Sequence, residues 1–159
     1  WSWNTNLIPE PTKLLQEIHD NGYKIALNLH PADGIDSIES PSYYKAMSRE
    51  LGGKYGSNGK IAWYLDYPDF TKSFFDNVIR DHESEGVDFW WLDWQQHLTS
   101  PYTPGLGQTF WCNHVFYNDM VKNRPDRRPV IFHRWRIREP SLPNWFFGRC
   151  PYKFPDSRI

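Results

Sequence analysis

The sequence contains little cysteine and almost no net charge, and both shortages exclude classes of protein. Its two cysteines, Cys112 and Cys150, form no Cys-x-x-Cys pair and supply no disulfide framework, so they do not define a redox compartment. A formal net charge of −1 gives no electrostatic reason to expect nucleic acid as a partner. No apolar run is long enough to cross a bilayer. We therefore expect no nucleic-acid partner and no membrane partner.

Motifs for metals, nucleotides and serine nucleophiles are also missing. The six histidines lack the spacing of zinc ligands, and no His-Glu-x-x-His, P-loop, Gly-x-Gly-x-x-Gly or Gly-x-Ser-x-Gly pattern occurs. We therefore expect no metal site and no organic cofactor.

Aromatic residues, by contrast, are abundant, with nine Trp, nine Tyr and ten Phe. Aromatic rings stack on the apolar faces of sugars, but they also fill protein cores, and core packing accounts for most of them. The length of 159 residues suits one domain with a sizeable core. It falls short of the about 250 residues that a whole (β/α)₈ barrel needs. Because the chain begins on Trp1 inside a motif, we expect a fragment.

Strand and helix patterns alternate along the chain. Apolar spacing and flanking Pro, Gly and Asn residues predict helices near 11–20 and 42–51, a longer amphipathic helix capped by Asp69, and a helix at about 109–121. Apolar runs predict strands at 24–29, 61–65, 86–96 and 129–135. This alternation is typical of an α/β fold with a parallel sheet.

The prediction of a parallel sheet depends most on the stretch Gly86–Gln96. Residues 87–92 place β-branched or aromatic side chains on both alternating faces, which is typical of a parallel strand covered on both sides. Asp93 follows where the apolar run ends, so its carboxylate is expected at the carboxyl end of the strand, where barrel enzymes carry out their chemistry. Asp88 faces the opposite side of the strand and is expected to be structural.

Polar side chains end all four predicted strands, namely His30, Asp66, Asp93 and Arg134. From the residues alone each has a second interpretation. Asp93 could bond loop amides, His30 could be a hydrogen-bonded structural residue, and Arg134 could be a surface cation. Asp66 and Asp33 lie near turn residues, which favours capping over an active role. Asn28, Gln95 and Gln96 add uncharged groups of the kind that bind hydroxyls.

Four motifs in order resemble glycoside hydrolase family 31. They are Trp1-Ser-Trp-Asn with Leu7-Ile-Pro, Leu27-Asn-Leu-His-Pro-Ala-Asp-Gly34, the stretch Gly86–Gln96, and Phe132 with Arg134-Trp135. The family comprises retaining α-glycosidases, such as α-glucosidases and α-xylosidases, built on a (β/α)₈ barrel. The resemblance covers residues 1 to about 135. It implies a partial (β/α)₈ TIM barrel, roughly half of the barrel.

The resemblance also implies roles for single residues. Asp93 matches the catalytic nucleophile, which would form a covalent glycosyl ester before a second carboxyl group, acting as acid and then base, completes the double displacement. His30 takes the place of an aspartate that binds the sugar in the −1 subsite of many members, and Arg134 matches an arginine that contacts the same sugar. Asn28, Trp91 and Asp66 complete the candidate substrate-binding set. The substrate would be an oligosaccharide or α-glycoside, and no cofactor is needed.

Two departures from the family pattern stand out. Trp94-Gln95-Gln96 replaces the Met-Asn-Glu that follows the nucleophile in better-known members. After Trp135 the sequence no longer resembles the family, whose corresponding segment ends in Thr-Gly-Phe-Ser-Gly-Asp with the acid/base as its last residue. Asn144–Cys150 can be coded AAC TGG TTT TTC GGG CGA TGT, and reading one nucleotide later gives that same hexapeptide.

We therefore predict two regions: residues 1–135, a partial hydrolase barrel, and residues 136–159, a tail that is possibly out of frame and that lacks the acid/base. Composition without periodicity predicts that the tail packs poorly. The parent enzyme would hydrolyse α-linked sugars with retention, whereas this chain alone would not. The alternatives are another barrel with an aspartate nucleophile, acting on α-galactosides, and a non-catalytic, aromatic-rich carbohydrate-binding module.

Overall fold

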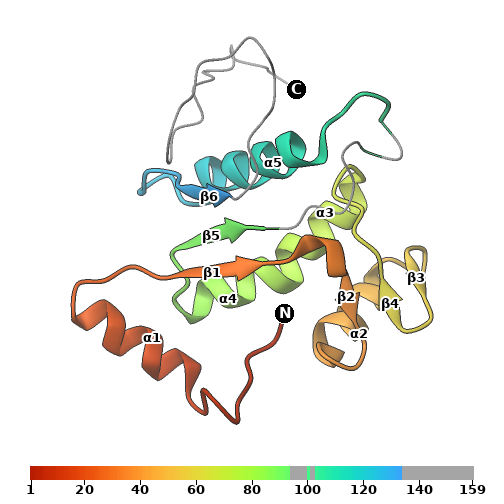
Figure 1. The fold of residues 1–159 in the computed structure, drawn as a ribbon. Coiled ribbons are helices and arrows are strands. Elements are labelled where there is room, and N and C mark those ends of the chain that lie inside the picture. The colour runs from red at the N-terminus through yellow and green to blue at the C-terminus, as the bar shows by residue number, and fades with distance from the viewer. Residues whose placement is uncertain (94–99, 101–102, 134–159) are drawn as a thin grey trace.

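The computed structural model describes residues 1–93, 100 and 103–133, and they form an α/β fold. Three short strands make a parallel sheet in the order β1-β5-β6, with bounds Ala26–Leu29, Phe89–Leu92 and Ile131–His133. The three strands run side by side in one direction (Figure 1). The prediction of parallel strands near 24–29, 86–96 and 129–135 is therefore confirmed for their described residues. Gln95, Gln96, Arg134 and Trp135 lie outside the described residues.

Helices connect the strands, as the alternating pattern predicted. Their bounds are α1 Pro11–Asp20, α2 Pro41–Glu50, α3 Pro68–Phe74, a π-helical segment η2 Phe75–Ile79, α4 Arg80–Glu85 and α5 Gln108–Asn123. Proline at the first turn starts α1, α2 and α3, because a first-turn residue needs no intrahelical donor. Segments α3, η2 and α4 follow one another without a break and form the longer amphipathic helix. Asp69 does not cap it: the cap position is Tyr67, without a side-chain cap bond.

A second, smaller sheet lies beyond the carboxyl end of β1 (Figure 1). The chain passes through a 3₁₀ turn, η1 at Pro31–Asp33, into an antiparallel sheet with the order β2-β4-β3. These strands span Ile35–Asp36, Lys60–Ile61 and Gly56–Ser57. Gly34 makes the turn into β2 with a φ of 65°, and the Ile61 carbonyl oxygen occupies the space that a Cβ would need.

The predicted strand at 61–65 is wrong beyond Ile61. Ile61, Trp63 and Leu65 are each buried at alternating positions, which gives the period of a strand. Beyond Ile61, however, the Ala62 N–H makes one long bond to the Tyr55 carbonyl, at 3.4 Å, and no strand is formed. The Leu65 carbonyl accepts hydrogen bonds from two side chains, Trp111 Nε1 at 2.9 Å and Thr71 Oγ1 at 2.7 Å. The alternation therefore comes from packing against the core rather than from a sheet.

The core lies on one face of the parallel sheet. In β5, Trp90 and Leu92 are buried, whereas Phe89 and Trp91, on the other face, are half-buried. Trp90 packs toward α4, where its ring lies 6.3 Å from that of His82. The expectation that β5 is covered on both sides is therefore wrong among the described residues, which cover only the face of Trp90 and Leu92 fully.

Candidate active site

The carboxyl ends of β1 and β5 bring two predicted site residues together. The strands pair in register up to Leu29 opposite Leu92, and the Asp93 N–H donates to the Leu29 carbonyl at 2.9 Å. This register places His30, which follows β1, beside Asp93, which follows β5. His30 Nε2 lies 3.8 Å from Asp93 Oδ2. The carboxylate of Asp93 is 6% exposed and the imidazole of His30 is 47% exposed.

One row further into the sheet, two more predicted residues lie in register. Asn28 is opposite Trp91, and Trp91 is opposite Phe132. The rings of Trp91 and Phe132 lie 5.5 Å apart. Trp91 Nε1 is buried and has no hydrogen-bond partner in the part of the chain that the structure describes. Asn28 and Trp91 therefore lie below Asp93 and His30 on neighbouring strands, and Phe132 extends the row in a way that sequence reasoning did not anticipate.

Asp66 contacts the loop that precedes α5. The Ser100 hydroxyl donates to Asp66 Oδ2, while Asp66 Oδ1 is buried and has no partner among residues 1–93, 100 and 103–133. Because α3 has no side-chain cap bond, Asp66 is not a helix cap. Ser100 was missed because a serine in a Pro-, Gly-, Ser- and Thr-rich loop carries no local signal for a long-range contact. Arg134 lies outside the described residues.

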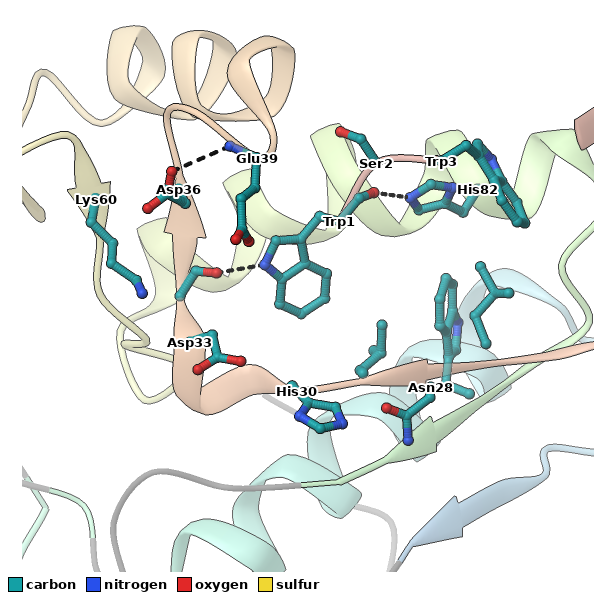
Figure 2. A pocket seen from close by; sticks show the side chains of 14 residues that line it. Trp1, Ser2, Trp3, Asn28, His30, Asp33, Asp36, Glu39, Lys60 and His82 are labelled. Carbon is teal, nitrogen blue, oxygen red and sulfur yellow. Dashed lines mark hydrogen bonds between the residues drawn. The ribbon is translucent and has the colours of Figure 1, made fainter. Parts of the chain in front are cut away.

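A cavity of about 320 Å³ adjoins His30 and is also lined by Trp90 of β5. Figure 2 shows Trp1 above it, with Asn28, His30 and Asp33 along its lower side. The Trp1 indole donates to the Gly34 carbonyl at 2.5 Å, and His82 Nε2 lies 2.6 Å from the Trp1 carbonyl oxygen. The motif residues at the start of the chain and those after β1 therefore enclose one space, which the sequence alone did not predict.

Asp88 lies at the opposite end of β5 and is held by basic groups. Its carboxylate contacts His19 Nε2 at 2.7 Å, Arg127 at 3.0 Å and Lys24 at 3.3 Å, and it accepts the Ile25 N–H at 3.0 Å. Burial would raise the pKa of Asp88, but hydrogen bonds from Ile25, His19 and Lys24 outweigh burial and lower it. These contacts agree with the structural role expected for Asp88.

Two further properties of the described residues bear on the kind of site. None of the described helices combines the length and the apolar character that a bilayer span requires. No group of three or more His, Cys, Asp or Glu side chains is placed to hold a metal ion in the described part of the chain.

Parallel strands joined by helices, with polar side chains at their carboxyl ends, define the class of α/β proteins to which barrel enzymes belong. Among curated proteins, none matches the chain. A family model described as the glycosyl hydrolases family 31 TIM-barrel domain matches residues 1–137. The chain therefore belongs to glycosyl hydrolase family 31, which confirms the resemblance found in the sequence. Membership makes this a glycoside hydrolase domain, with a carbohydrate as its substrate class.

Proposed function

We propose that residues 1–135 form roughly half of a (β/α)₈ barrel and carry the nucleophile of a retaining α-glycosidase. The observation that carries the proposal is the position of Asp93: a buried carboxylate directly after a parallel strand, beside His30, in a chain of family 31. In barrel enzymes the carboxyl ends of the strands surround the substrate. More specifically, we propose that the substrate is an α-glucoside.

In the proposed mechanism Asp93 attacks the anomeric carbon of the sugar. The glycosidic bond breaks, its electrons leave with the aglycone oxygen, and a glycosyl ester of Asp93 forms. Asn28, His30, Trp91, Asp66 and Arg134 form the proposed set of sugar contacts. Buried polar atoms at Trp91 Nε1 and Asp66 Oδ1, which lack partners among the described residues, support a role in binding hydroxyl groups.

The second carboxyl group of a retaining enzyme should lie about 5–5.5 Å from the nucleophile. We propose that it is absent from this polypeptide, because residues 136–159 read as an out-of-frame version of the family segment that carries it. Glu139 and Asp156, the carboxylates of the tail, lie outside the described residues. Sequencing the coding DNA tests this: an unbroken frame matching related DNA only in the present register would defeat it.

The nucleophile can be tested without the acid/base by supplying a leaving group that needs no proton. With an activated α-glucosyl fluoride the C1–F bond breaks, fluoride leaves with the electron pair, and a C1–O bond to the carboxylate forms. We expect the intact mass of the chain to rise by one glucosyl unit, and Asp93→Asn to abolish the rise. Asp88→Asn is the matched control and should retain it. Labelling of both variants alike would contradict the proposal.

Turnover and sugar identity are separate questions. Incubation with an aryl α-glucoside should give no turnover by the 159-residue chain, because Asp93, as the nucleophile, cannot also protonate the leaving group and then activate water. Turnover that disappears in Asp93→Asn would contradict this expected inactivity.

An α-galactosyl fluoride tests the alternative of a barrel that acts on α-galactosides. Faster labelling by the galactosyl fluoride than by the glucosyl fluoride would favour that alternative. Binding of sugars that survives replacement of Asp93, without labelling, would favour a binding module.

A further inference from the structure

Asp66 and Ser100 lie at the same end of the parallel sheet as Asp93. Asp66 precedes α3, and Ser100 lies in the loop that precedes α5. Each helix leads back to the amino end of a strand, α3 through η2 and α4 to β5, and α5 to β6, so both helices begin near the carboxyl ends of the strands (Figure 1). In barrel enzymes the loops at this end bind the substrate. Asp66 and Ser100 are therefore on the side of the sheet that carries the proposed nucleophile.

Two hydrogen bonds hold the hydroxyl group of Ser100 in one direction. Its oxygen accepts the Thr103 N–H at 3.0 Å, and its proton is donated to Asp66 Oδ2. The Ser100 N–H donates to the Leu106 carbonyl at 2.7 Å, and Ser100 is 6% exposed. A hydroxyl that accepts from a backbone N–H still has its own proton to donate. The loop before α5 therefore fixes Ser100, and Ser100 in turn fixes one oxygen of Asp66.

The main chain beside Asp66 is held as well. The Leu65 carbonyl accepts hydrogen bonds from Trp111 of α5 at 2.9 Å and from Thr71 of α3 at 2.7 Å. With its backbone and Oδ2 both held, the Asp66 carboxylate keeps Oδ1 as its second acceptor. This oxygen is buried and has no partner in the described part of the chain. A buried carboxylate oxygen without a donor is costly, and a hydroxyl group of a ligand would supply that donor.

We propose that Ser100 is a positioning residue for the substrate site: its hydroxyl holds the Asp66 carboxylate so that Oδ1 accepts a hydrogen bond from one hydroxyl group of the bound sugar. This inference rests on the proposed function, in which Asp66 belongs to the set of sugar contacts. Ser100 acts through Asp66 and does not itself touch the sugar. Loss of its hydroxyl should weaken sugar binding, and the bond-breaking step at Asp93 should keep its rate.

The first test measures the rate at which the α-glucosyl fluoride labels Asp93 as a function of its concentration. Ser100→Ala should raise the half-saturating concentration about tenfold, as expected for one lost hydrogen bond to a charged group. The maximal rate should stay within about twofold of the parent value, because the lost contact binds ground state and transition state alike. Ser100→Thr keeps the hydroxyl and should restore the half-saturating concentration. Asp66→Ala should raise it at least as much as Ser100→Ala, and the double variant should add nothing to Asp66→Ala.

Ser73 provides the matched control. It is also fully buried, and its hydroxyl donates to a carboxylate, Glu50 Oε2, at 2.8 Å. Ser73→Ala therefore removes the same chemical group and the same kind of hydrogen bond from the contact between α3 and α2. It should leave the half-saturating concentration unchanged. Thermal melts verify that each variant is folded.

The second test measures equilibrium binding and needs no reaction, so it separates failure of this inference from failure of the proposed function. The probes are methyl α-glucoside and its deoxy analogues, each lacking one hydroxyl group, titrated into the chain. One analogue should bind the parent chain about tenfold more weakly than methyl α-glucoside, because it lacks the hydroxyl that donates to Asp66. In Ser100→Ala that analogue and methyl α-glucoside should bind alike.

The outcomes of the two tests are distinct. A half-saturating concentration that rises in Ser100→Ala, returns in Ser100→Thr and does not change in Ser73→Ala supports the inference. An equal rise in Ser73→Ala, no rise in Ser100→Ala, or a change in the maximal rate alone overturns it. Absence of labelling in the parent chain defeats the proposed function, and the titrations then decide the inference. Weaker binding of methyl α-glucoside by Ser100→Ala than by the parent chain supports it, whereas equal binding, or no binding by the parent chain, overturns it.

Discussion

The two ends of β5 hold the same pair of residue types in two different ways. At the amino end Asp88 and His19 are 2.7 Å apart, and Arg127, Lys24 and the Ile25 N–H share the carboxylate. At the carboxyl end Asp93 and His30 are 3.8 Å apart, and the imidazole is turned toward a cavity. At the amino end the carboxylate is therefore held by several donors at once, and at the carboxyl end the histidine partner lies further away and borders the cavity.

This difference matches a general property of barrel enzymes. Residues at the amino ends of the strands serve stability, and residues at the carboxyl ends serve catalysis. In this chain the contacts of Asp88 connect the last turn of α1 and the residues after it with the start of β5 and the turn before β6. The Asp93 end gathers side chains from separate βα loops. Variants at the two ends should therefore separate folding from chemistry.

The largest effect on stability is expected on the buried face of β5. Trp90→Ala removes an indole that is 1% exposed and should lower the free energy of unfolding by about 4 kcal/mol. Trp91→Ala, one residue on and half-buried on the opposite face, should cost about 1–2 kcal/mol. Urea titrations of the two variants measure this difference. Equal losses would mean that both faces are packed alike, contrary to the arrangement described above.

The next effect concerns the carboxylate of Asp88. Asp88→Ala leaves His19, Arg127 and the Ile25 N–H without their shared acceptor, and it should lower the free energy of unfolding by about 3 kcal/mol. A urea titration of Asp88→Ala measures this loss, and an unchanged free energy of unfolding would contradict the structural role of Asp88.

A smaller effect should follow from pH. The pKa of Asp88 is lowered in the folded chain, so the folded state releases this proton more readily than the unfolded state does. The resulting stabilisation is present above the unfolded pKa of about 3.9 and is lost as the pH falls through the folded pKa. Thermal melts from pH 7 to pH 3 should show this loss. In Asp88→Asn the acid limb should be shallower, and an unchanged limb would assign the acid lability to other groups.

Local signals in the sequence were sufficient for much of the fold. Proline starts and the Asn21-Gly22 end located α1, and the run of β-branched and aromatic residues located β5. Residues 62–65 were misassigned because burial at alternate positions imitates a strand. The small β2-β4-β3 sheet was not predicted, since strands of two residues carry too little pattern to detect.

Part of the candidate site could also be predicted. Because the carboxyl ends of parallel strands lie at one edge, the sequence placed His30 and Asp93 at the same edge. The pairing of β1 with β5, which brings the two side chains to 3.8 Å, came from the structure. The contact of Ser100 with Asp66 and the cavity beside Trp1 could not be predicted. They depend on where loops fold back in space, and no local periodicity encodes that. The roles of the site residues in the reaction stay predictions.

The most direct measurement is the fragmentation mass spectrum of the chain after reaction with the activated α-glucosyl fluoride. It reports which side chain carries the sugar. The account predicts one glucosyl group, attached as an ester at Asp93 and absent from Asp88. A glucosyl group on any other residue, or none under conditions in which the chain is folded, would contradict the assignment of Asp93 as the nucleophile.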